Sequence, residues 1–322
     1  MLKDIHATKG KASAKMITVG EVHTALLQHS SAITGQFAAE ILALVEGDRV
    51  RSSERPIAHT SSPELLTGVD CVLPTTGGAR VRGIGTAVSR ALVTGGHVVQ
   101  ASTFAEIRRS EHTRRMPWAH YLGRPGVIEY IGRADDKALA DGFCTPPAGS
   151  EILNLGAISG RVIDTVQRHV DRDPPLRAGR TRLRWAADDG GPHATMDLRI
   201  DDNVSRTIRL RAGNTGVPEL AALCEDIAVH DWLLTTVLNN VERANIGTGE
   251  RVDVVRRLRP VIVHMLHLWM PAARLGAEPA ALWDDLERRP GFTRQWHTLI
   301  SRIRDQMMLA TIASGGGHAG EA

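Results

Sequence analysis

The sequence predicts an α+β protein with a β-rich N-terminal half, a three-stranded antiparallel meander and a helical C-terminal layer. Between residues 16 and 145, short apolar runs alternate with Gly, Pro and Ser clusters, which is typical of strands and turns. Beyond Pro218, apolar residues recur at the spacing of amphipathic helices. With 322 residues, 42% of them hydrophobic, the chain can bury one large core or two ordinary ones.

Three elements of the N-terminal half stand out. Residues 17–27 have the pattern of a strand, and residues 35–47 have that of a short helix that stops at Gly47. Two apolar runs, 79–93 and 97–109, flank the sequence Thr-Gly-Gly. Because its two glycines adopt positive φ without steric cost, we predict a hairpin at this point.

The run "CTPPAGS" at residues 144–150 interrupts the pattern and predicts a boundary between two units, 16–145 and 151–312. Four of the five lysines fall within residues 1–15, which lack hydrophobic periodicity. We expect this segment to be a disordered extension, or to precede a start at Met16. Residues 313–322 are expected to form a disordered tail.

After a predicted helix at 154–170, three runs at 181–187, 194–200 and 205–211 alternate apolar and polar residues. Such a meander would bury one face and expose the other to solvent. The exposed face would carry Arg182, Arg184, Arg199, Arg209 and Arg211. It could bind nucleic-acid phosphates or an acidic protein, or simply be solvated; it lacks the aromatic residues on which bases stack.

Four helices are predicted in the C-terminal layer, over 218–245, 251–270, 279–289 and 293–312. In the first of them, His230 and Asp231 lie close to the apolar stripe. A buried carboxylate needs a partner, and the arginines of the later helices offer one: Arg259, Arg294, Arg302 and Arg304.

The pair His230 and Asp231 is a weak catalytic candidate. It resembles the dipeptide of HD-type metallophosphohydrolases, but that fold needs a further histidine upstream on a helix and a further aspartate downstream, and the 20 residues before His230 include loop and strand without a histidine. The alternative is a structural pair that fixes the register of the helix.

Metal and cofactor motifs are not found. His264 and His267 lie on the polar flank of their predicted helix, without an accompanying Glu. The Gly-rich run at 75–87 lacks the Lys-Ser or Lys-Thr of a P-loop and the third glycine of a dinucleotide fingerprint. We therefore predict no metal and no cofactor.

The composition predicts a cytoplasmic protein without a membrane span. Its three cysteines, Cys71, Cys144 and Cys224, are odd in number and far apart, which argues against a disulfide framework. Of 39 basic residues only five are lysines, and the codon bias of a GC-rich genome explains such an excess of arginine.

Long runs of the chain resemble a family of conserved hypothetical actinomycete proteins that are named after Streptomyces loci. The resemblance extends from Met16 to about residue 312 and is carried by "GEVHTALLQ", "ERPIAHTSSPELLTGVDCVLPT", "PWAHYLGRPGVIE", "TRLRWAA", "HDWLLTTVLNNVERA", "RLRPVIVHMLHLWMPAARL" and "LWDDLERRPGFTRQWHTLISRIRDQMMLAT". It implies genes encoded beside a variant P-loop protein and a SAM-dependent methyltransferase-like protein, and it assigns no catalytic residue.

Three functions remain open at this point. We expect first a non-catalytic partner or regulatory subunit of a bacterial multi-protein system, because a catalytic constellation is missing. The alternative is an enzyme or enzyme subunit that uses His230 and Asp231 with an arginine-lined anion site. The second alternative is nucleic-acid binding through the arginine face.

Overall fold

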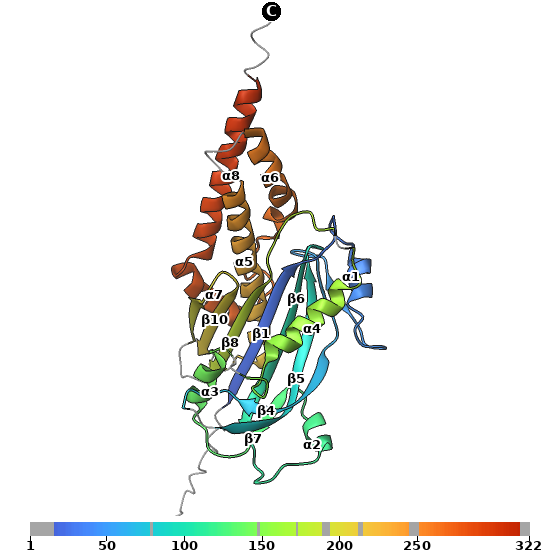
Figure 1. The fold of residues 1–322 in the computed structure, drawn as a ribbon, viewed down its shortest axis with the longest axis vertical. Helices are drawn as coiled ribbons and strands as arrows, with labels where there is room; N and C mark the ends of the chain where they lie inside the picture. Colours follow the sequence, from blue (N-terminus) through green and yellow to red (C-terminus); the bar gives the residue numbers. More distant parts are fainter. Residues whose placement is uncertain are drawn as a thin grey trace, which may run out of the picture.

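The computed structural model describes residues 16–77, 80–146, 149–171, 173–188, 194–211, 215–244 and 251–315. The predicted extension, 1–15, and residues 316–322 of the predicted tail therefore lie outside the described residues. In the described part, one ten-stranded mixed sheet is covered by helices on both faces, and a helical arm projects from one end (Figure 1).

The strands are β1 (Ile17–Leu26), β2 (Arg51–Ser53), β3 (His59–Ser61), β4 (Leu65–Leu73), β5 (Val81–Thr94), β6 (Val98–Arg109), β7 (Val127–Tyr130), β8 (Thr181–Asp188), β9 (Thr195–Ile200) and β10 (Ser205–Arg211). Their order is β2-β3-β5-β7-β6-β1-β8-β10-β9, with β4 beside β5. Because β1 pairs with both β6 and β8, strands from both sides of the predicted boundary belong to the same sheet.

The predicted hairpin is β5 and β6, which pair antiparallel. Its turn places Gly95 at φ 59° and Gly96 at φ 68°, in the region that other residues rarely adopt.

The helices are α1 (Gly35–Ile41), α2 (Trp118–Leu122), α3 (Asp136–Phe143), α4 (Leu155–Gln167), α5 (Val217–Arg243), α6 (Arg251–His264), α7 (Ala277–Arg288) and α8 (Phe292–Gly315), with a 3-10 turn η1 (Leu266–Leu268) after α6. The four predicted C-terminal helices thus correspond to α5, α6 with η1, α7 and α8. The last runs to Gly315, so the predicted tail at 313–322 begins too early.

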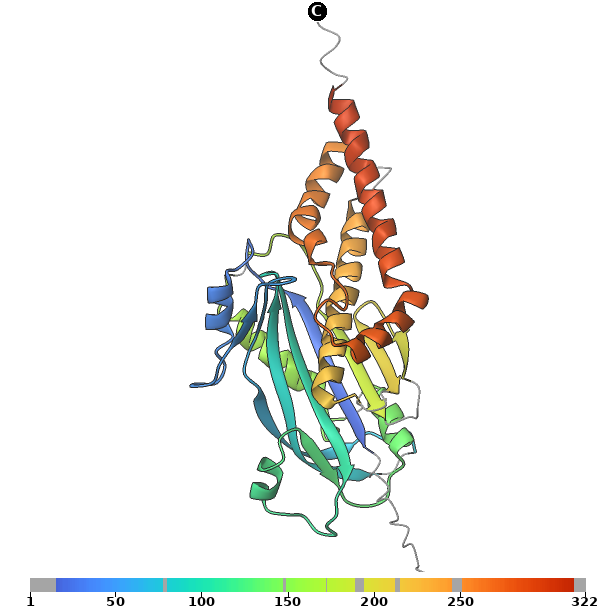
Figure 2. The same ribbon diagram turned by 180° about the vertical axis from the view of Figure 1, so that it is seen from behind.

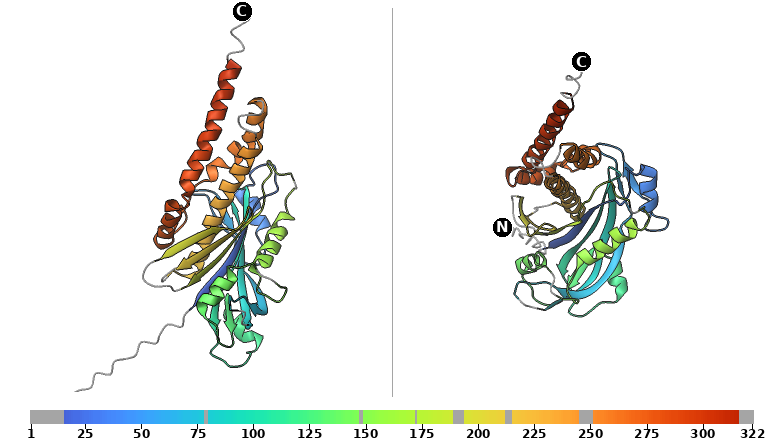
Figure 3. Two further views of the ribbon diagram at one scale, coloured as in Figure 1. Left: turned by 60° about the vertical axis from the view of Figure 1, so that its left-hand side comes forward. Right: turned by 45° about the horizontal axis from the view of Figure 1, so that its top comes forward.

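Helices α4 and α5 lie on opposite faces of the sheet, which the two views of Figures 1 and 2 show. Strand β1 is buried on both sides as a result. Ile17 and Val19 belong to the core beneath α3 and α4, whereas Val22 and Leu26 belong to the core beneath α5. Helices α5, α6 and α8 extend beyond the sheet as the arm (Figure 3).

Helix α5 is apolar on nearly all sides because it lies between the sheet and α6, α7 and α8. Trp232 is fully buried there, and its indole Nε1 donates to the carbonyl of Gly179 at 2.7 Å. No helix in the described part of the chain is long and apolar enough to cross a membrane.

The prediction of an antiparallel meander at 181–211 is wrong. Strand β10 pairs with β8 in parallel and with β9 antiparallel, so β9 is the edge strand and β8 does not contact it as a neighbour. The alternation of side chains identified the apolar face of β8 and β10 correctly, since Leu183, Trp185, Ile208 and Leu210 are buried. On β9 it was only partly right, because Met196 and Leu198 are half-buried and Ile200 is exposed. Alternation carries no information about strand order, which is why the pairing was missed.

Candidate functional site

A pocket of about 470 Å³ lies between the start of α4 and strands β1, β8 and β10. We call it the α4 pocket. Its lining combines buried and exposed charged residues from segments that are distant in sequence. It consists of Glu21, His23, Pro146, Asn154, Gly156, Ala157, Arg182, Arg184, Asp201, Asp202, Ser205, Arg206 and Thr207.

The register of β1 and β8 brings four of these residues together. Glu21 is opposite Arg184, and His23 is opposite Arg182, two residues further along the same face. Paired positions and positions two apart on one face are side-chain neighbours in a sheet. The pocket floor is therefore built by the pairing of two strands whose sequences are far apart.

Glu21 and His23 form a buried acid–imidazole pair. The Nε2 atom of His23 lies 3.2 Å from Oε1 of Glu21, and the two residues are 7% and 3% exposed. The other ring nitrogen, Nδ1 of His23, is buried without a hydrogen-bond partner in the described part of the chain. An unsatisfied buried polar atom in a pocket lining indicates that a ligand or water completes the site.

Arg184 supports the pair from β8. Its Nε donates to Oε2 of Glu21 at 3.2 Å. Burial opposes ionisation of Glu21, but the hydrogen bond from His23 and the charge of Arg184 outweigh it and hold the pKa of Glu21 below its ordinary value. Glu21 is thus an ionised carboxylate that orients His23.

Helix α4 approaches this pair closely because of Gly156. A Cβ atom at that position would lie 2.2 Å from Oε1 of Glu21, so a larger residue would displace the carboxylate. The helix starts with Asn154, whose side chain accepts the N–H of Ala157 at 2.9 Å. One turn later, the hydroxyl of Ser159 donates to the backbone carbonyl of Glu21 at 2.9 Å.

At the mouth of the pocket, the carboxylates are already engaged. Asp202 accepts the N–H groups of Val204 and Ser205 at 2.6 and 2.7 Å. Asp201 accepts the side chains of Arg199 and Thr207. Arg182 is exposed and donates one hydrogen bond to the Ser205 hydroxyl at 2.8 Å, which leaves further donors of its guanidinium available.

The arrangement can do two things chemically. Arg182 can hold a carboxylate or a phosphate through its forked N–H groups. His23, oriented by Glu21, can donate or accept a hydrogen bond or a proton at Nδ1, as an oriented base does in acid–base catalysis.

The five predicted arginines are not one solvated face. Arg182 and Arg184 line the α4 pocket, whereas Arg209 forms ion pairs with Asp188 and, at 3.4 Å, with Asp141 of α3. Arg199 and Arg211 are exposed. Helix α3 packs against β8 on this side of the sheet, so the predicted arginine face is only partly open: Arg184 and Arg209 are half-buried, and whether the face binds an anion remains a prediction.

Within α5, the ring of His230 is used structurally. Its Nδ1 donates to the carbonyl of Asp226 at 2.7 Å, and its Nε2 accepts the N–H of Met270 at 3.2 Å. The ring also makes edge contacts with Trp269 and Trp283. Both nitrogens are therefore occupied by the backbone, which fits the register-fixing interpretation.

Asp231 is buried as predicted, but the predicted partners on the later helices are wrong. The Nε of Arg206 on β10 lies 3.0 Å from its carboxylate. Arg206 is 5% exposed and also donates to the Thr235 hydroxyl at 3.0 Å.

His264 at the end of α6 and His267 in η1 lie near a third histidine. Nδ1 of His264 lies 3.2 Å from Nε2 of His97, which follows the hairpin turn, and the rings of His97 and His267 lie 6.3 Å apart. Among the described residues, no group of three or more His, Cys, Asp or Glu side chains is arranged to hold a metal ion.

Sequence reasoning missed Glu21 and His23. The signal was present, because two ionisable residues alternate within an otherwise apolar strand, "ITVGEVHTAL". Charged residues are rarely buried unless they are paired, so such a strand indicates an internal polar site.

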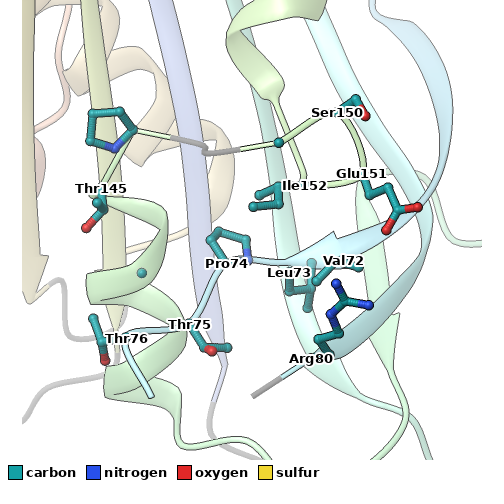
Figure 4. Close-up of a pocket in the computed structure, with 13 residues that line it drawn as sticks. Val72, Leu73, Pro74, Thr75, Thr76, Arg80, Thr145, Ser150, Glu151 and Ile152 are labelled. Atoms are coloured by element: carbon teal, nitrogen blue, oxygen red, sulfur yellow. The ribbon is translucent and has the colours of Figure 1, made fainter. Parts of the chain in front are cut away.

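Another cavity, of about 540 Å³, lies between the end of β4, α3 and residues 149–152 (Figure 4). Its charged lining residues, Arg80 and Glu151, are both exposed. Since it contains no buried acid–base pair among the described residues, it is a weaker candidate than the α4 pocket.

No protein-family model matches the chain, and no curated protein or solved structure is significantly similar to it. The resemblance to the Streptomyces-named family accordingly remains an expectation.

Proposed function

We propose that the protein binds a small organic anion in the α4 pocket. The single observation that carries the proposal is that the buried Nδ1 of His23, a residue of the pocket lining, lacks a hydrogen-bond partner in the described part of the chain. Arg182 supplies the positive charge at the mouth, and the Glu21–His23 pair supplies an oriented hydrogen-bonding group inside. A pocket of about 470 Å³ is within the range of small-molecule sites.

The proposal keeps one element of the enzyme alternative, the arginine-lined anion site, but moves its acid–base group from His230 to His23. Both ring nitrogens of His230 are hydrogen-bonded, whereas His23, a residue of the pocket lining, has one nitrogen without a partner among the described residues. An enzyme of this kind would use His23 for proton transfer and Glu21 to orient it.

The experiment is a binding titration of a panel of small carboxylates and phosphate esters, by calorimetry, on the wild type and two arginine variants. Arg182→Ala removes a pocket cation, and Arg211→Ala removes an exposed arginine outside the pocket. We expect at least tenfold weaker binding for Arg182→Ala and no change for Arg211→Ala. Equal affinities in both variants, or no binding by any member of the panel, would contradict the proposal.

We propose as a second candidate function that the protein is a partner subunit that docks through its helical arm. Four large apolar side chains are exposed where the end of α5, the start of α6 and the end of α8 lie together (Figure 3). They are Leu238, Val252, Met308 and Leu309, exposed by 39%, 74%, 57% and 48%. Where such side chains form one contiguous patch, they make an interaction surface.

The test is affinity purification of the tagged protein from its source organism at low and near-physiological salt. Leu309→Asp alters the arm, and Leu122→Asp on α2 is the matched exposed control. A stoichiometric partner should be recovered by the wild type and Leu122→Asp but not by Leu309→Asp. Recovery of no specific partner by the wild type would remove this candidate.

A further inference from the structure

A second, smaller pocket lies on the opposite face of the sheet, beneath the first turns of α5. We call it the α5 pocket. Its volume is about 260 Å³, and strands β3 and β5, helix α5 and the segment before α7 line it. The lining residues are His59, Ser61, Arg90, Leu92, Ala222, Glu225, Asp226, Arg274 and Leu275.

Arg90 and Glu225 of this pocket form an ion pair with each other. Arg90 donates through Nε and Nη2 to the two carboxylate oxygens of Glu225, both at 2.8 Å. This bidentate geometry satisfies the planar fork of the arginine and both oxygens of the acid. Neither side chain therefore needs a ligand.

A strained residue positions the second arginine of the pocket. Ala272 has φ 58°, the one positive φ of a residue other than glycine in the described part of the chain. Its N–H donates to Oδ2 of Asp226 at 2.8 Å, which holds this turn against α5. Strain of this kind costs about 1–3 kcal/mol and persists where the surroundings impose it, often at ligand sites. The turn brings Arg274 into the pocket lining.

The side chain of Arg274 has no hydrogen-bonding acceptor in the described part of the chain. Its guanidinium is partly buried, and within the described ranges it makes no hydrogen bond or ion pair at contact distance. Burial lowers the pKa of Arg274, and the charges of Asp226 and Glu225 compensate only in part. Five donors thus line a pocket whose acidic groups are already bonded to Arg90 and to Ala272.

The pKa of His59 reflects the same positive charges. Burial, together with the positive charges of Arg274 and Arg90, lowers its pKa to about 3, so it is neutral at physiological pH. Its Nδ1 lies 3.3 Å from the Thr94 hydroxyl, which leaves its other nitrogen for the pocket. An anion in the α5 pocket would stabilise the charge of Arg274 and would raise the pKa of His59 toward its ordinary value.

We propose that the α5 pocket binds a small carboxylate, which Arg274 holds through its forked N–H groups. The charges of Arg90 and Arg274 are balanced by those of Glu225 and Asp226 within the pocket. A monoanion therefore suits it better than a phosphate dianion, which would face two resident carboxylates. Its volume of about 260 Å³ corresponds to roughly nine water molecules, which limits the ligand to about ten non-hydrogen atoms.

The experiment uses acetate, L-lactate and inorganic phosphate as probes, with calorimetry and the NMR shift of the His59 Cε1–H as the two measurements. We expect L-lactate or acetate to bind saturably and to shift the His59 resonance, which His59→Gln identifies. Arg274→Ala should weaken carboxylate binding at least tenfold and abolish the shift. Arg274→Lys, which keeps the charge but not the fork, should recover only part of the affinity.

Arg182→Ala separates the two pockets, because it alters the α4 pocket and leaves the α5 pocket intact. The His59 shift should survive in Arg182→Ala and disappear in Arg274→Ala. Since Arg274 makes no hydrogen bond in the described structure, its variants should unfold at the wild-type temperature. An unchanged carboxylate affinity in the His59 shift of Arg274→Ala, or tighter binding of phosphate than of either carboxylate in the His59 shift of the wild type, would overturn the proposal.

Discussion

The guanidinium of Arg206 on β10 lies 3.0 Å from the carboxylate of Asp231 on α5, and both residues are 5% exposed. This ion pair connects the sheet to the central helix inside the larger core. Removing one member of a buried pair leaves the other charge uncompensated and costs about 3–5 kcal/mol. We therefore expect Asp231→Ala to lower the free energy of unfolding by that amount, measured by urea denaturation.

The matched control is the exposed pair of Arg199 and Asp201, which lie 2.6 Å apart. Because water screens such a pair, Arg199→Ala should change the free energy of unfolding by less than about 1 kcal/mol. Replacing both buried charges, with Arg206→Met and Asp231→Leu, should recover much of the loss. Equal effects of Asp231→Ala and Arg199→Ala would show that the buried pair does not stabilise the fold.

This pair also shows what sequence could and could not predict. The helical spacing of α5 indicated correctly that Asp231 points inward and needs a cation. The partner was sought on the later helices, whereas Arg206 shares the parity of Ile208 and Leu210 on the apolar face of β10. An arginine on the apolar side of a strand was the available signal. Which strand lies under which helix is a tertiary property, and neither the helical nor the strand periodicity of the apolar residues reveals it.

The α4 pocket was harder to predict for the same reason. Arg182 and Arg184 were identified as an anion-binding surface, but their partners Glu21 and His23 come from the first strand. Local propensity predicted β1 and β8 separately, and their register depends on a pairing across more than 150 residues of chain. The parallel pairing of β8 and β10 was missed because three consecutive strands most often form a meander.

Gly156 and Gly160 occupy successive turns of α4 and provide a test of the α4 pocket. A Cβ at Gly156 would lie 2.2 Å from Glu21, whereas the nearest neighbour of a Cβ at Gly160 is His23 at 3.8 Å. We expect Gly156→Ala to destabilise the protein by about 1–3 kcal/mol through overpacking, and to weaken anion binding. Gly160→Ala should instead stabilise it by about 0.5–1 kcal/mol through helix propensity.

Thermal unfolding of the two glycine variants, followed by titration with the anion bound by the wild type, measures both effects. The two substitutions add the same methyl group to the same helix, so a difference between them reflects their different neighbours: Glu21 at 2.2 Å from the added group at Gly156, and His23 at 3.8 Å from that at Gly160. If Gly156→Ala were as stable as Gly160→Ala and bound the anion equally well, the close approach of α4 to Glu21 would be unnecessary.

His97 predicts a pH dependence of stability. Burial, with the nearby rings of His264, His267 and His29, lowers its pKa to about 4 from the ordinary 6.5. The unfolded chain therefore takes up a proton below about pH 6.5 that the folded protein refuses until about pH 4. The contribution of His97 to the free energy of unfolding is therefore fully present above about pH 6.5. It falls by up to about 3 kcal/mol as the pH decreases from about 6.5 to about 4.

The measurement is the urea-unfolding free energy of the wild type and His97→Asn at pH 7, 5.5 and 4.5. The difference between the two proteins should change in favour of His97→Asn as the pH falls, because other titrating groups are common to both. His112→Asn, at an exposed position, serves as the control. A pH-independent difference between wild type and His97→Asn would show that His97 titrates normally in the folded state.

His230 distinguishes a structural role from a catalytic one. Its ring packs against Trp269 and Trp283, and both nitrogens are bonded to backbone groups. Truncating a buried ring of this kind costs about 2–5 kcal/mol, so His230→Ala should lower the unfolding temperature while the anion affinity of the α4 pocket stays unchanged. His23→Ala should do the reverse, with a larger loss of binding than of stability. Loss of binding in His230→Ala at unchanged stability would return His230 to the functional site, because a purely structural ring can act on a distant pocket only through the fold.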